Sequence, residues 1–429
     1  MNADTGSYGK TNPSRGAALD GFSLFRNHPE IFEIEVINVL CYTLPMSKTE
    51  LIILVLFILY LLYLIGEALL VRRDRKKLRH VVYVNGTRGK STVTRMIAAG
   101  LSAGGHRVLC KTTGTLPIAI YPDGHQEEII RHAPANIKEQ IKYLHIAARE
   151  GADILVIECM ALQPEYQRVS GKNMLHCDVG VITNARLDHM DVMGETREEI
   201  LACLMEMLPE KGLILTAERD FPDILEARAR KLGSRLIITE EESLKDLPGA
   251  AALDFPENVA LALGVCQALG VERLTAFEGL KSFIRDPYAL SVHEGPNTLL
   301  VNALSANDVS STKMIYEKTR GPEEEELVIL INNRGDRPAR ARDMARLVKE
   351  MQPRAVWMLG DNQEALGALC RKAAPGAAIQ GFERAEEIPF ASDHPRLILA
   401  MGNIKNQGIR LVERAKAELK EKEMGAYVQ

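Results

Sequence analysis

The chain has 429 residues, which at roughly 150 residues per domain predicts two to three domains with a substantial core in each. Hydrophobic residues make up 46% of the sequence and charged residues 26%, which excludes a mostly disordered or fibrous protein. Lys and Arg number 53 against 57 Asp and Glu, so the chain lacks the basic excess typical of nucleic-acid-binding proteins. Its seven Cys show no spacing typical of a zinc site or a disulfide framework, which predicts reduced thiols.

The first predicted element is hydrophobic: it starts at Leu51 and ends at Val71, where the basic run Arg72–Lys77 follows. At about 1.5 Å per residue this segment spans about 32 Å, enough to cross a hydrocarbon core about 30 Å thick. We therefore predict one transmembrane helix over residues 51–71, with the basic run on its cytoplasmic side. A buried core helix is the alternative, but such helices seldom lack polar residues over four turns.

The residues before this helix, 1–50, form an N-terminal extension in which we recognise no chemistry. A cleavable signal peptide is disfavoured, because the apolar stretch begins far into the chain and no charged segment introduces it. Met46 would place the hydrophobic segment next to a chain start, so we expect translation to begin naturally there.

After a basic linker over residues 72–80, short β-branched runs alternate with helical segments, which predicts parallel α/β layers. The pattern pauses at Asp286-Pro287, so we expect an ATP-binding domain over 81–290 and a second domain over 291–429. The predicted fold is α/β: a P-loop ATPase domain with a parallel sheet, followed by a smaller Rossmann-like domain and preceded by the transmembrane helix. Strands are expected at 81–84, 153–157, 179–183, 212–215, 236–238, 299–301, 327–331, 355–359 and 396–400, and helices at 91–103, 257–269 and 406–422.

The sharpest motif lies between the first of these strands and the helix after it, and reads N-G-T-R-G-K-S-T over residues 85–92. In a phosphate-binding loop the glycines turn backbone amides toward the anion, Lys90 reaches the outer phosphates and Ser91 ligates magnesium. Position 84 is Val rather than Gly, so this is a shorter variant of the strict pattern. A Gly-rich turn with an exposed lysine is the alternative. The residues expected to bind ATP here are Gly86, Thr87, Arg88, Gly89, Lys90, Ser91 and Thr92.

Two further predicted strands end in groups suited to a divalent metal, Glu158 and His189. Ligands of an open parallel sheet bind beyond the carboxyl ends of its strands, so both side chains could converge with Lys90. Taken alone, Glu158 is more often a salt-linked strand-end carboxylate and His189 a loop histidine. Together with the loop they predict a phosphate and metal site.

With these motifs in place, the sequence from about residue 46 to about residue 420 resembles the Mur ligase superfamily of ATP-dependent amide ligases. Within it, the sequence is most similar to the ligase subunit of poly-γ-glutamate synthase, the PgsB or CapB type. The motifs that carry the resemblance are V-N-G-T-R-G-K-S-T at 84–92, K-T-T-G-T at 111–115, P-A-N-I-K-E-Q at 134–140, E-C-M-A at 158–161, D-H-M-D-V-M-G at 188–194, F-P-E-N-V-A-L-A-L-G at 255–264, A-N-D-V-S-S-T at 306–312 and N-N-R-G-D-R at 332–337.

The resemblance implies further roles for these residues. It places Ser91 and Thr113 near a first Mg²⁺, and Glu158 and His189 with the Mg²⁺ that bridges the transferred phosphate and the acceptor carboxylate. It places Asn258 beside the nucleotide, although an Asn at this spacing equally fits a cap of the following helix.

In the second domain the resemblance points to Arg334 and Arg337, which would face the cleft and grip a polycarboxylate or a developing phosphate charge. A salt-linked loop with Asp336 is the alternative. Asn302, Asn307 and Asp308 are weaker candidates on the same side.

The chain departs from the family pattern in three respects. No domain for a UDP-linked substrate separates the hydrophobic segment from the loop, which argues against a nucleotide-sugar acceptor. The stretch 201–207 lacks the lysine that Mur ligases carbamylate. Ser291 stands where poly-γ-glutamate ligases have an Arg, for which Arg285 could substitute.

The resemblance therefore implies a membrane-anchored ligase that polymerises glutamate through γ-amide bonds and an acyl phosphate, with ATP and Mg²⁺ as cofactors. Its implied partners are glutamate, the growing polymer and a polytopic membrane subunit of the synthase, with the catalytic domains in the cytoplasm. Two alternatives stay open: a folylpolyglutamate- or cyanophycin-type ligase, and a P-loop ATPase switch at the membrane.

Overall fold

The computed structural model describes residues 47–114, 116–131, 134–306, 309–320, 326–335 and 338–422. The chain divides into two compact units, Met1–Leu70 and Val71–Gln429, which we describe separately.

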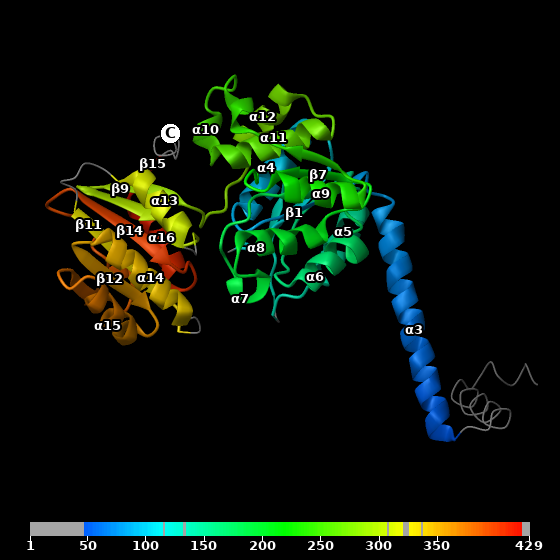
Figure 1. Cartoon of the computed structure of the whole chain (residues 1–429), viewed down its shortest axis with the longest axis horizontal. Helices are drawn as coiled ribbons and strands as arrows, with labels where there is room; N and C mark the ends of the chain where they lie inside the picture. The colour runs from blue at the N-terminus through cyan, green and yellow to red at the C-terminus, as the bar shows by residue number, and fades with distance from the viewer. Residues whose placement is uncertain are drawn as a thin grey trace, which may run out of the picture. The chain divides into compact units, whose positions relative to one another are not determined.

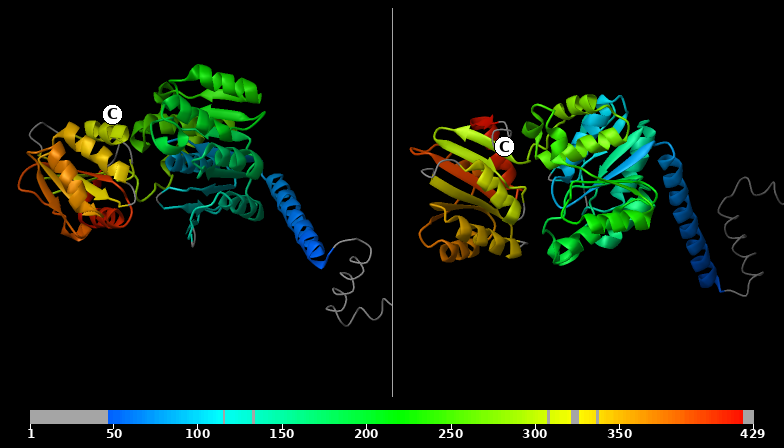
Figure 2. Two further views of the ribbon diagram at one scale, coloured as in Figure 1. Left: turned by 60° about the horizontal axis from the view of Figure 1, so that its bottom comes forward. Right: turned by 45° about the horizontal axis from the view of Figure 1, so that its top comes forward.

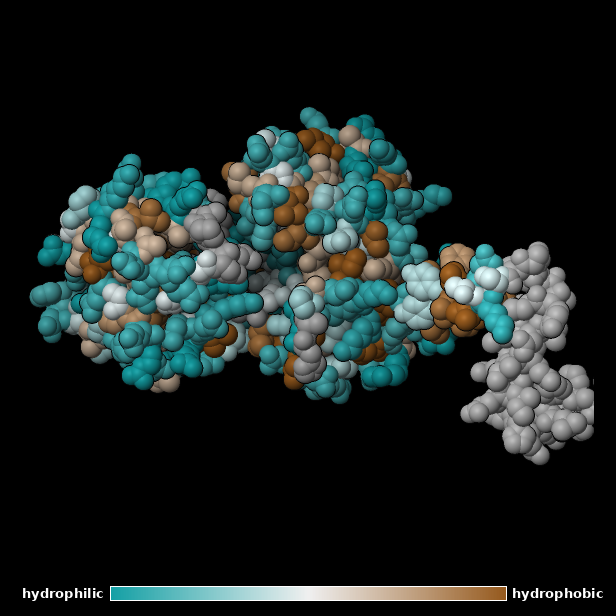
Figure 3. Space-filling model, turned by 90° about the horizontal axis from the view of Figure 1, so that it is seen from below, coloured by the Kyte–Doolittle hydropathy of each residue, from teal (hydrophilic) through white to brown (hydrophobic). Residues whose placement is uncertain are grey.

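The described part of the first unit is helix α3, Lys48–Arg75, whose last residues belong to the second unit. Ser47 and Glu50 form a reciprocal cap that starts it: Glu50 Oε2 accepts from Ser47 N at 2.7 Å, and Ser47 Oγ accepts from Glu50 N at 3.2 Å. The helix is long and apolar enough to cross a membrane (Figure 1). Its large hydrophobic side chains are mostly exposed (Figure 3). It extends beyond the predicted span at both ends, and its last turn includes residues 72–75 of the predicted linker.

The second unit begins with an eight-stranded sheet in the order β4-β3-β2-β5-β1-β6-β7-β8. The strands are parallel except at one edge, where β3 runs antiparallel to both β2 and β4. Their bounds are β1 His80–Asn85, β2 Val108–Lys111, β3 Ile118–Ile120, β4 Gln126–Glu128, β5 Ile154–Glu158, β6 Val179–Ile182, β7 Leu213–Thr216 and β8 Arg235–Ile238.

Helices cover both faces of this sheet because its strand residues alternate between two cores (Figure 2). Val81 and Tyr83 of β1 pack with α5, α8 and α9, whereas Val82 and Val84 pack with α4, α11 and α12. The helices are α4 Lys90–Ala103, α5 Glu139–Arg149, α6 Pro164–Arg168, α7 Met190–Met193, α8 Arg197–Leu204, α9 Pro222–Leu232, α10 Ala250–Leu253, α11 Pro256–Ala268 and α12 Arg273–Lys281, with shorter turns of helix at Val169–Met174, Met205–Met207 and Glu241–Leu244.

A seven-stranded sheet follows, in the order β13-β12-β11-β14-β10-β9-β15, parallel except for β9 and β15. Helices α14 and α15 pack on one face and α16 on the other. The bounds are β9 Ser291–Gly295, β10 Thr298–Asn302, β11 Glu326–Asn333, β12 Ala355–Gly360, β13 Ala378–Gly381, β14 Arg396–Gly402, β15 Lys420–Lys422, α13 Val309–Thr319, α14 Pro338–Met351, α15 Gln363–Ala373, α16 Gln407–Glu418 and the turn Ala385–Glu387.

The predicted α/β class and every strand expected from the sequence are confirmed, with ends shifted by a few residues. The helix predicted over 406–422 is wrong at its end, because it stops at Glu418 and residues Lys420–Lys422 pair with β9 as β15. Five further strands, β2, β3, β4, β9 and β13, were not predicted from the sequence; each has three to five residues, and β4 and β13 lie at sheet edges.

Candidate active site

The loop between β1 and α4 is shaped by two glycines with positive φ, Gly86 at 138° and Gly89 at 78°. A side chain at either position has no room: a Cβ on Gly86 would lie 1.9 Å from Thr183 Oγ1, and one on Gly89 2.7 Å from Asn258 Oδ1. The loop is therefore packed tightly between the end of β6 and the start of α11. Only glycine tolerates both the positive φ and the short distance to the neighbouring side chain.

The loop leads into the N-terminus of α4, which no side chain caps. The first backbone amides of a helix have no partner within it, and together with the helix dipole they favour an anion at this point. Lys90 is half-buried, and its Nζ donates to the carbonyl oxygens of Gly86 at 2.6 Å and Thr87 at 3.4 Å. An ammonium group is thus held at the mouth of the loop, where it could exchange these carbonyls for phosphate oxygens.

Glu158, the last residue of β5, joins the loop to the strand next to it. Glu158 is 2% exposed, and its Oε2 accepts hydrogen bonds from Ser91 Oγ at 2.8 Å and from the Thr113 backbone N–H at 2.7 Å. Three of the four residues predicted to serve a metal therefore lie together. A hydroxyl and a carboxylate are the oxygen donors that Mg²⁺ prefers.

The described residues contain no group of three or more His, Cys, Asp or Glu side chains that could hold a metal. A cation bound by Ser91 and Glu158 would therefore complete its coordination with water and phosphate oxygens, as is usual for Mg²⁺ in nucleotide sites. The donor set fits such an ion.

His189, the fourth predicted metal residue, precedes α7 with a left-handed backbone, φ 48°. Its Nε2 lies 3.7 Å from Asp188 Oδ2, and the same carboxylate oxygen pairs with Arg88 Nη2 at 3.1 Å. A positive φ is uncommon outside glycine and is found disproportionately at functional sites. His189 lines the same cavity as Glu158.

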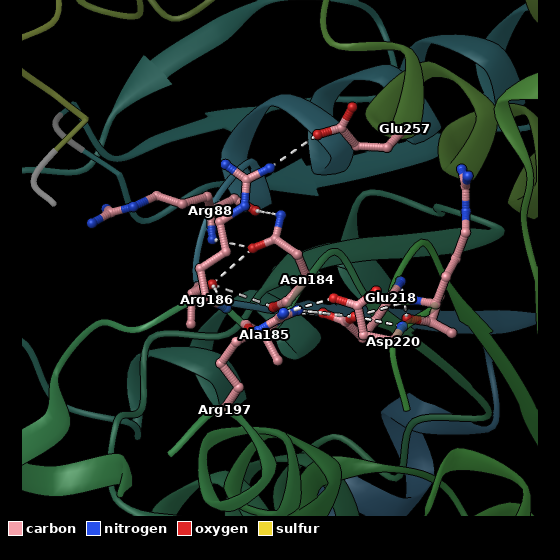
Figure 4. A network of polar contacts seen from close by, with 11 residues as sticks. Arg88, Asn184, Ala185, Arg186, Arg197, Glu218, Asp220 and Glu257 are labelled. Carbon is pink, nitrogen blue, oxygen red and sulfur yellow. Dashed lines mark hydrogen bonds and ion pairs between the residues drawn. The ribbon is translucent and has the colours of Figure 1, made fainter. Parts of the chain in front are cut away.

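Asn184 holds the loop from the end of β6 (Figure 4). Its Oδ1 accepts from Thr87 Oγ1 at 2.7 Å and from Arg88 N at 3.1 Å, and the Thr87 hydroxyl also accepts from Arg186 N at 2.9 Å. The guanidinium of Arg186 reaches Glu257 at 3.2 Å, which links the loop network to the start of α11 (Figure 4). These contacts fix the loop conformation.

Further contacts hold Ala185, which lies between Asn184 and Arg186 of this network (Figure 4). Ala185 N donates to Glu218 Oε2 at 2.8 Å, and its carbonyl accepts from Arg197 Nε at 2.8 Å. Arg197 also pairs with Asp220 at 2.6 Å. In the segment after β6, the backbone N–H and the carbonyl of Ala185 are therefore both hydrogen-bonded to charged side chains.

Asn258 is buried in the first turn of α11, and its Nδ2 donates to Asp254 Oδ1 at 2.6 Å. No side chain caps α11, so the capping alternative for Asn258 is wrong. Burial raises the pKa of Asp254, against the hydrogen bond from Asn258, which lowers it. Asn258 thus places a polar group against Gly89 at the loop.

These residues line one cavity of about 520 Å³. Of the described residues predicted for the site, all border it except Arg334 and Asn302. Residues that the sequence analysis did not select also border it; those with charged side chains are Arg131, Arg186, Asp188, Asp254, Glu257 and Asp286. Arg285 borders it too, whereas Ser291 is buried in β9 against His293 and Asn302.

Arg334 follows β11 and borders a separate small hollow with Asn332, Arg340 and Asn403. Asn302 is buried, and its Nδ2 donates to the carbonyl oxygen of Ala289 at 2.9 Å, which is a structural contact. The predicted residues Arg337, Asp336, Asn307 and Asp308 lie outside the described residues. The predicted second domain, residues 291–429, instead contributes Ser305, Ser311 and Met314 to the cavity wall.

Two family descriptions match the chain: "Mur ligase middle domain" over residues 84–255 and "Poly-gamma-glutamate synthase CapB C-terminal domain" over residues 288–418. PGA synthase CapB from Bacillus subtilis (strain 168) is 31% identical over 350 residues, 78% of this chain and 89% of that protein. Capsule biosynthesis protein CapB from Bacillus anthracis is 35% identical over 275 residues, 62% of this chain and 59% of that protein. In fold, the chain is similar to E. coli FolC in complex with ADP, with a TM-score of 0.60 at 17% identity over 82% of this chain and 93% of that one.

Proposed function

The chain belongs to the CapB family within the Mur ligase superfamily, and from this premise we propose that it polymerises glutamate through γ-amide bonds. Family membership makes it an ATP-dependent ligase. The proposed reaction consumes ATP at the loop 85–92, with the protein anchored in the cell membrane by α3 and its lobes in the cytoplasm. The observation that carries the proposal is the grouping of Lys90, Ser91 and Glu158 on one cavity wall.

In the proposed reaction the γ-phosphoryl group of ATP moves to a carboxylate oxygen of the growing end, and the bond to the departing ADP breaks. The amine nitrogen of the next glutamate then attacks the acyl carbon, phosphate leaves and the nitrogen loses a proton. Lys90 and the amides at the start of α4 would neutralise the phosphates, because charge builds there in the transition state. Ser91 and Glu158 would hold Mg²⁺, which supplies further neutralisation of phosphate charge.

The surroundings suit this sequence of steps. The acyl phosphate is destroyed by water, and the cavity draws its wall from both lobes, so bound substrates would be shielded. We keep the proposed roles of His189 and Thr113 beside the metal and of Asn258 beside the nucleotide. Arg334 and Arg337 remain proposed partners for carboxylates from the second lobe, and a polytopic membrane subunit remains the proposed partner in the membrane.

The proposal is tested by product analysis. Membranes that contain the full chain are supplied with ATP, Mg²⁺ and labelled glutamate, and the product is tested for γ-linked polymer. We expect polymer and ADP in a fixed ratio, with neither formed by Glu158→Ala. ATP consumption without incorporation of glutamate would reject the proposed ligation.

A further inference from the structure

A buried charge cluster lies at the end of β2, among residues to which the proposed function assigns no role. Lys111 Nζ lies 2.7 Å from Glu139 Oε1, and Arg131 grips the same carboxylate with two hydrogen bonds, Nε to Oε2 at 2.8 Å and Nη2 to Oε1 at 2.9 Å. We call Lys111, Arg131 and Glu139 the Arg131 cluster.

The Arg131 cluster carries more positive than negative charge. Lys111 is fully buried and the side chain of Glu139 is 12% exposed. Burial acts to raise the pKa of Glu139, but the hydrogen bonds from Arg131 and the charge of Lys111 prevail and lower it to about 2. Burial lowers the pKa of Lys111, whereas the charge of Glu139 and the hydrogen bond to it raise that pKa. With one carboxylate beside an amine and a guanidinium, the cluster suits an anionic ligand.

Arg131 is the member that meets the cavity, which it lines together with Gly114, Ala135 and Glu158. Its fork to Glu139 uses Nε and Nη2, so Nη1 takes no part in those two bonds. A guanidinium fixed in this way has lost most of its rotamer freedom before a ligand arrives.

The strand order locates the Arg131 cluster relative to the nucleotide. β5 lies between β2 and β1, so Glu158 separates Lys111 at the end of β2 from the loop that follows β1. Gln140 spans this gap: its Oε1 accepts from Lys111 Nζ at 3.3 Å, and its Nε2 donates to the Glu158 carbonyl at 3.0 Å. A group receiving phosphate near Glu158 would therefore have the Arg131 cluster on its far side.

We propose that Arg131 binds the free α-carboxylate of the acceptor's terminal glutamate, while Lys111 and Glu139 position its guanidinium. This inference rests on the proposed function. A terminal residue of a γ-linked chain carries two carboxylates, one to be phosphorylated and one that stays free. Holding the free one beyond Glu158 leaves the γ-carboxylate facing the nucleotide, so Arg131 sets both affinity and the choice of reacting carboxylate.

The test compares two acceptors with the full-length enzyme: an oligo-γ-glutamate, and the same oligomer ending in γ-aminobutyrate, which keeps the reacting carboxylate and lacks the free one. Acceptor-dependent ADP release gives kcat/KM for each. We expect the wild type to prefer the glutamate-terminated acceptor by about 10- to 100-fold, typical of one charge-assisted pair. Arg131→Ala should reduce this ratio to about one with KM for ATP unchanged, and Arg131→Lys should leave an intermediate ratio.

The ratio of the two kcat/KM values does not depend on how much of a variant folds, because both acceptors are assayed with the same enzyme preparation. A purely structural Arg131 would lower both rates equally, and an unchanged ratio in Arg131→Ala would overturn the inference while leaving the proposed function standing. Failure of the wild type to use either acceptor would instead reject the proposed function. The control is Arg149→Ala, an exposed residue paired with Glu150, which should retain the wild-type ratio.

Discussion

Lys90 is the residue on which nucleotide chemistry most depends. Its ammonium group lies at the loop mouth, half-buried, and its contacts are to loop carbonyls and not to the core. Lys90→Ala should lower ATP turnover by about two orders of magnitude or more, with the melting temperature unchanged. Lys172→Ala, which breaks a surface pair with Glu210, is the control. Turnover near the wild-type rate would place the site elsewhere.

Gly89 offers a sharper test of the loop, because the chain contains a matched glycine. Gly89 and Gly105 both have positive φ, 78° and 87°, but a Cβ on Gly105 meets nothing within 4 Å. Each Gly→Ala change should cost about 1 kcal/mol of unfolding free energy through backbone strain. Only Gly89→Ala should also raise KM for ATP, by about tenfold or more, because its methyl group displaces the Asn258 amide. Equal KM values in the two variants would contradict this view of the loop.

Strands and helices were predicted correctly where a buried face or a sequence motif determines the local structure. β1 and β5 are β-branched and buried on both faces, so their sequences indicate central parallel strands. β4 is three exposed polar residues and β15 is three charged ones; both exist through pairing with a neighbouring strand, which local sequence does not show. Contacts between separate elements limited the prediction of the site in the same way. Arg131 depends on a carboxylate eight residues away that a separate helix presents, whereas Arg334 follows a correctly predicted strand but borders another hollow.

Helix α5 carries a pH-sensitive carboxylate, Glu139. The folded-state pKa of Glu139 is about 2, below its usual value of 4.5, so its ionised form stabilises the fold. That contribution is complete above pH 4.5 and is lost as the pH falls toward 2, with an upper limit of about 3 kcal/mol. The free energy of unfolding, measured by denaturant titration from pH 6 to pH 3, should fall more steeply for the wild type than for Glu139→Gln. Parallel curves would show that Glu139 is not held ionised.

The division of the chain into two units predicts that membrane association and catalysis can be separated. Deleting residues 1–70 removes the exposed apolar helix, while Asp74 and Arg75 keep their pairs with His145 and Asp178. The truncated protein should leave the membrane fraction and retain ADP release with a soluble acceptor. Deleting residues 1–45 alone should change neither property. A 1–70 deletion that still sediments with membranes would contradict anchoring by α3.

In the proposed reaction phosphate passes from ATP to a carboxylate, and capture by hydroxylamine distinguishes this step from phosphate transfer to water. An acyl phosphate is an anhydride that hydroxylamine captures, whereas an ATPase switch transfers phosphate to water and leaves nothing to capture. The enzyme with ATP, Mg²⁺, a glutamate-terminated acceptor and hydroxylamine in place of the amine should form hydroxamate and ADP in equal amounts. Glu158→Ala should suppress both by removing a metal-binding carboxylate. Release of AMP, or of ADP without acceptor and without hydroxamate, would contradict the account.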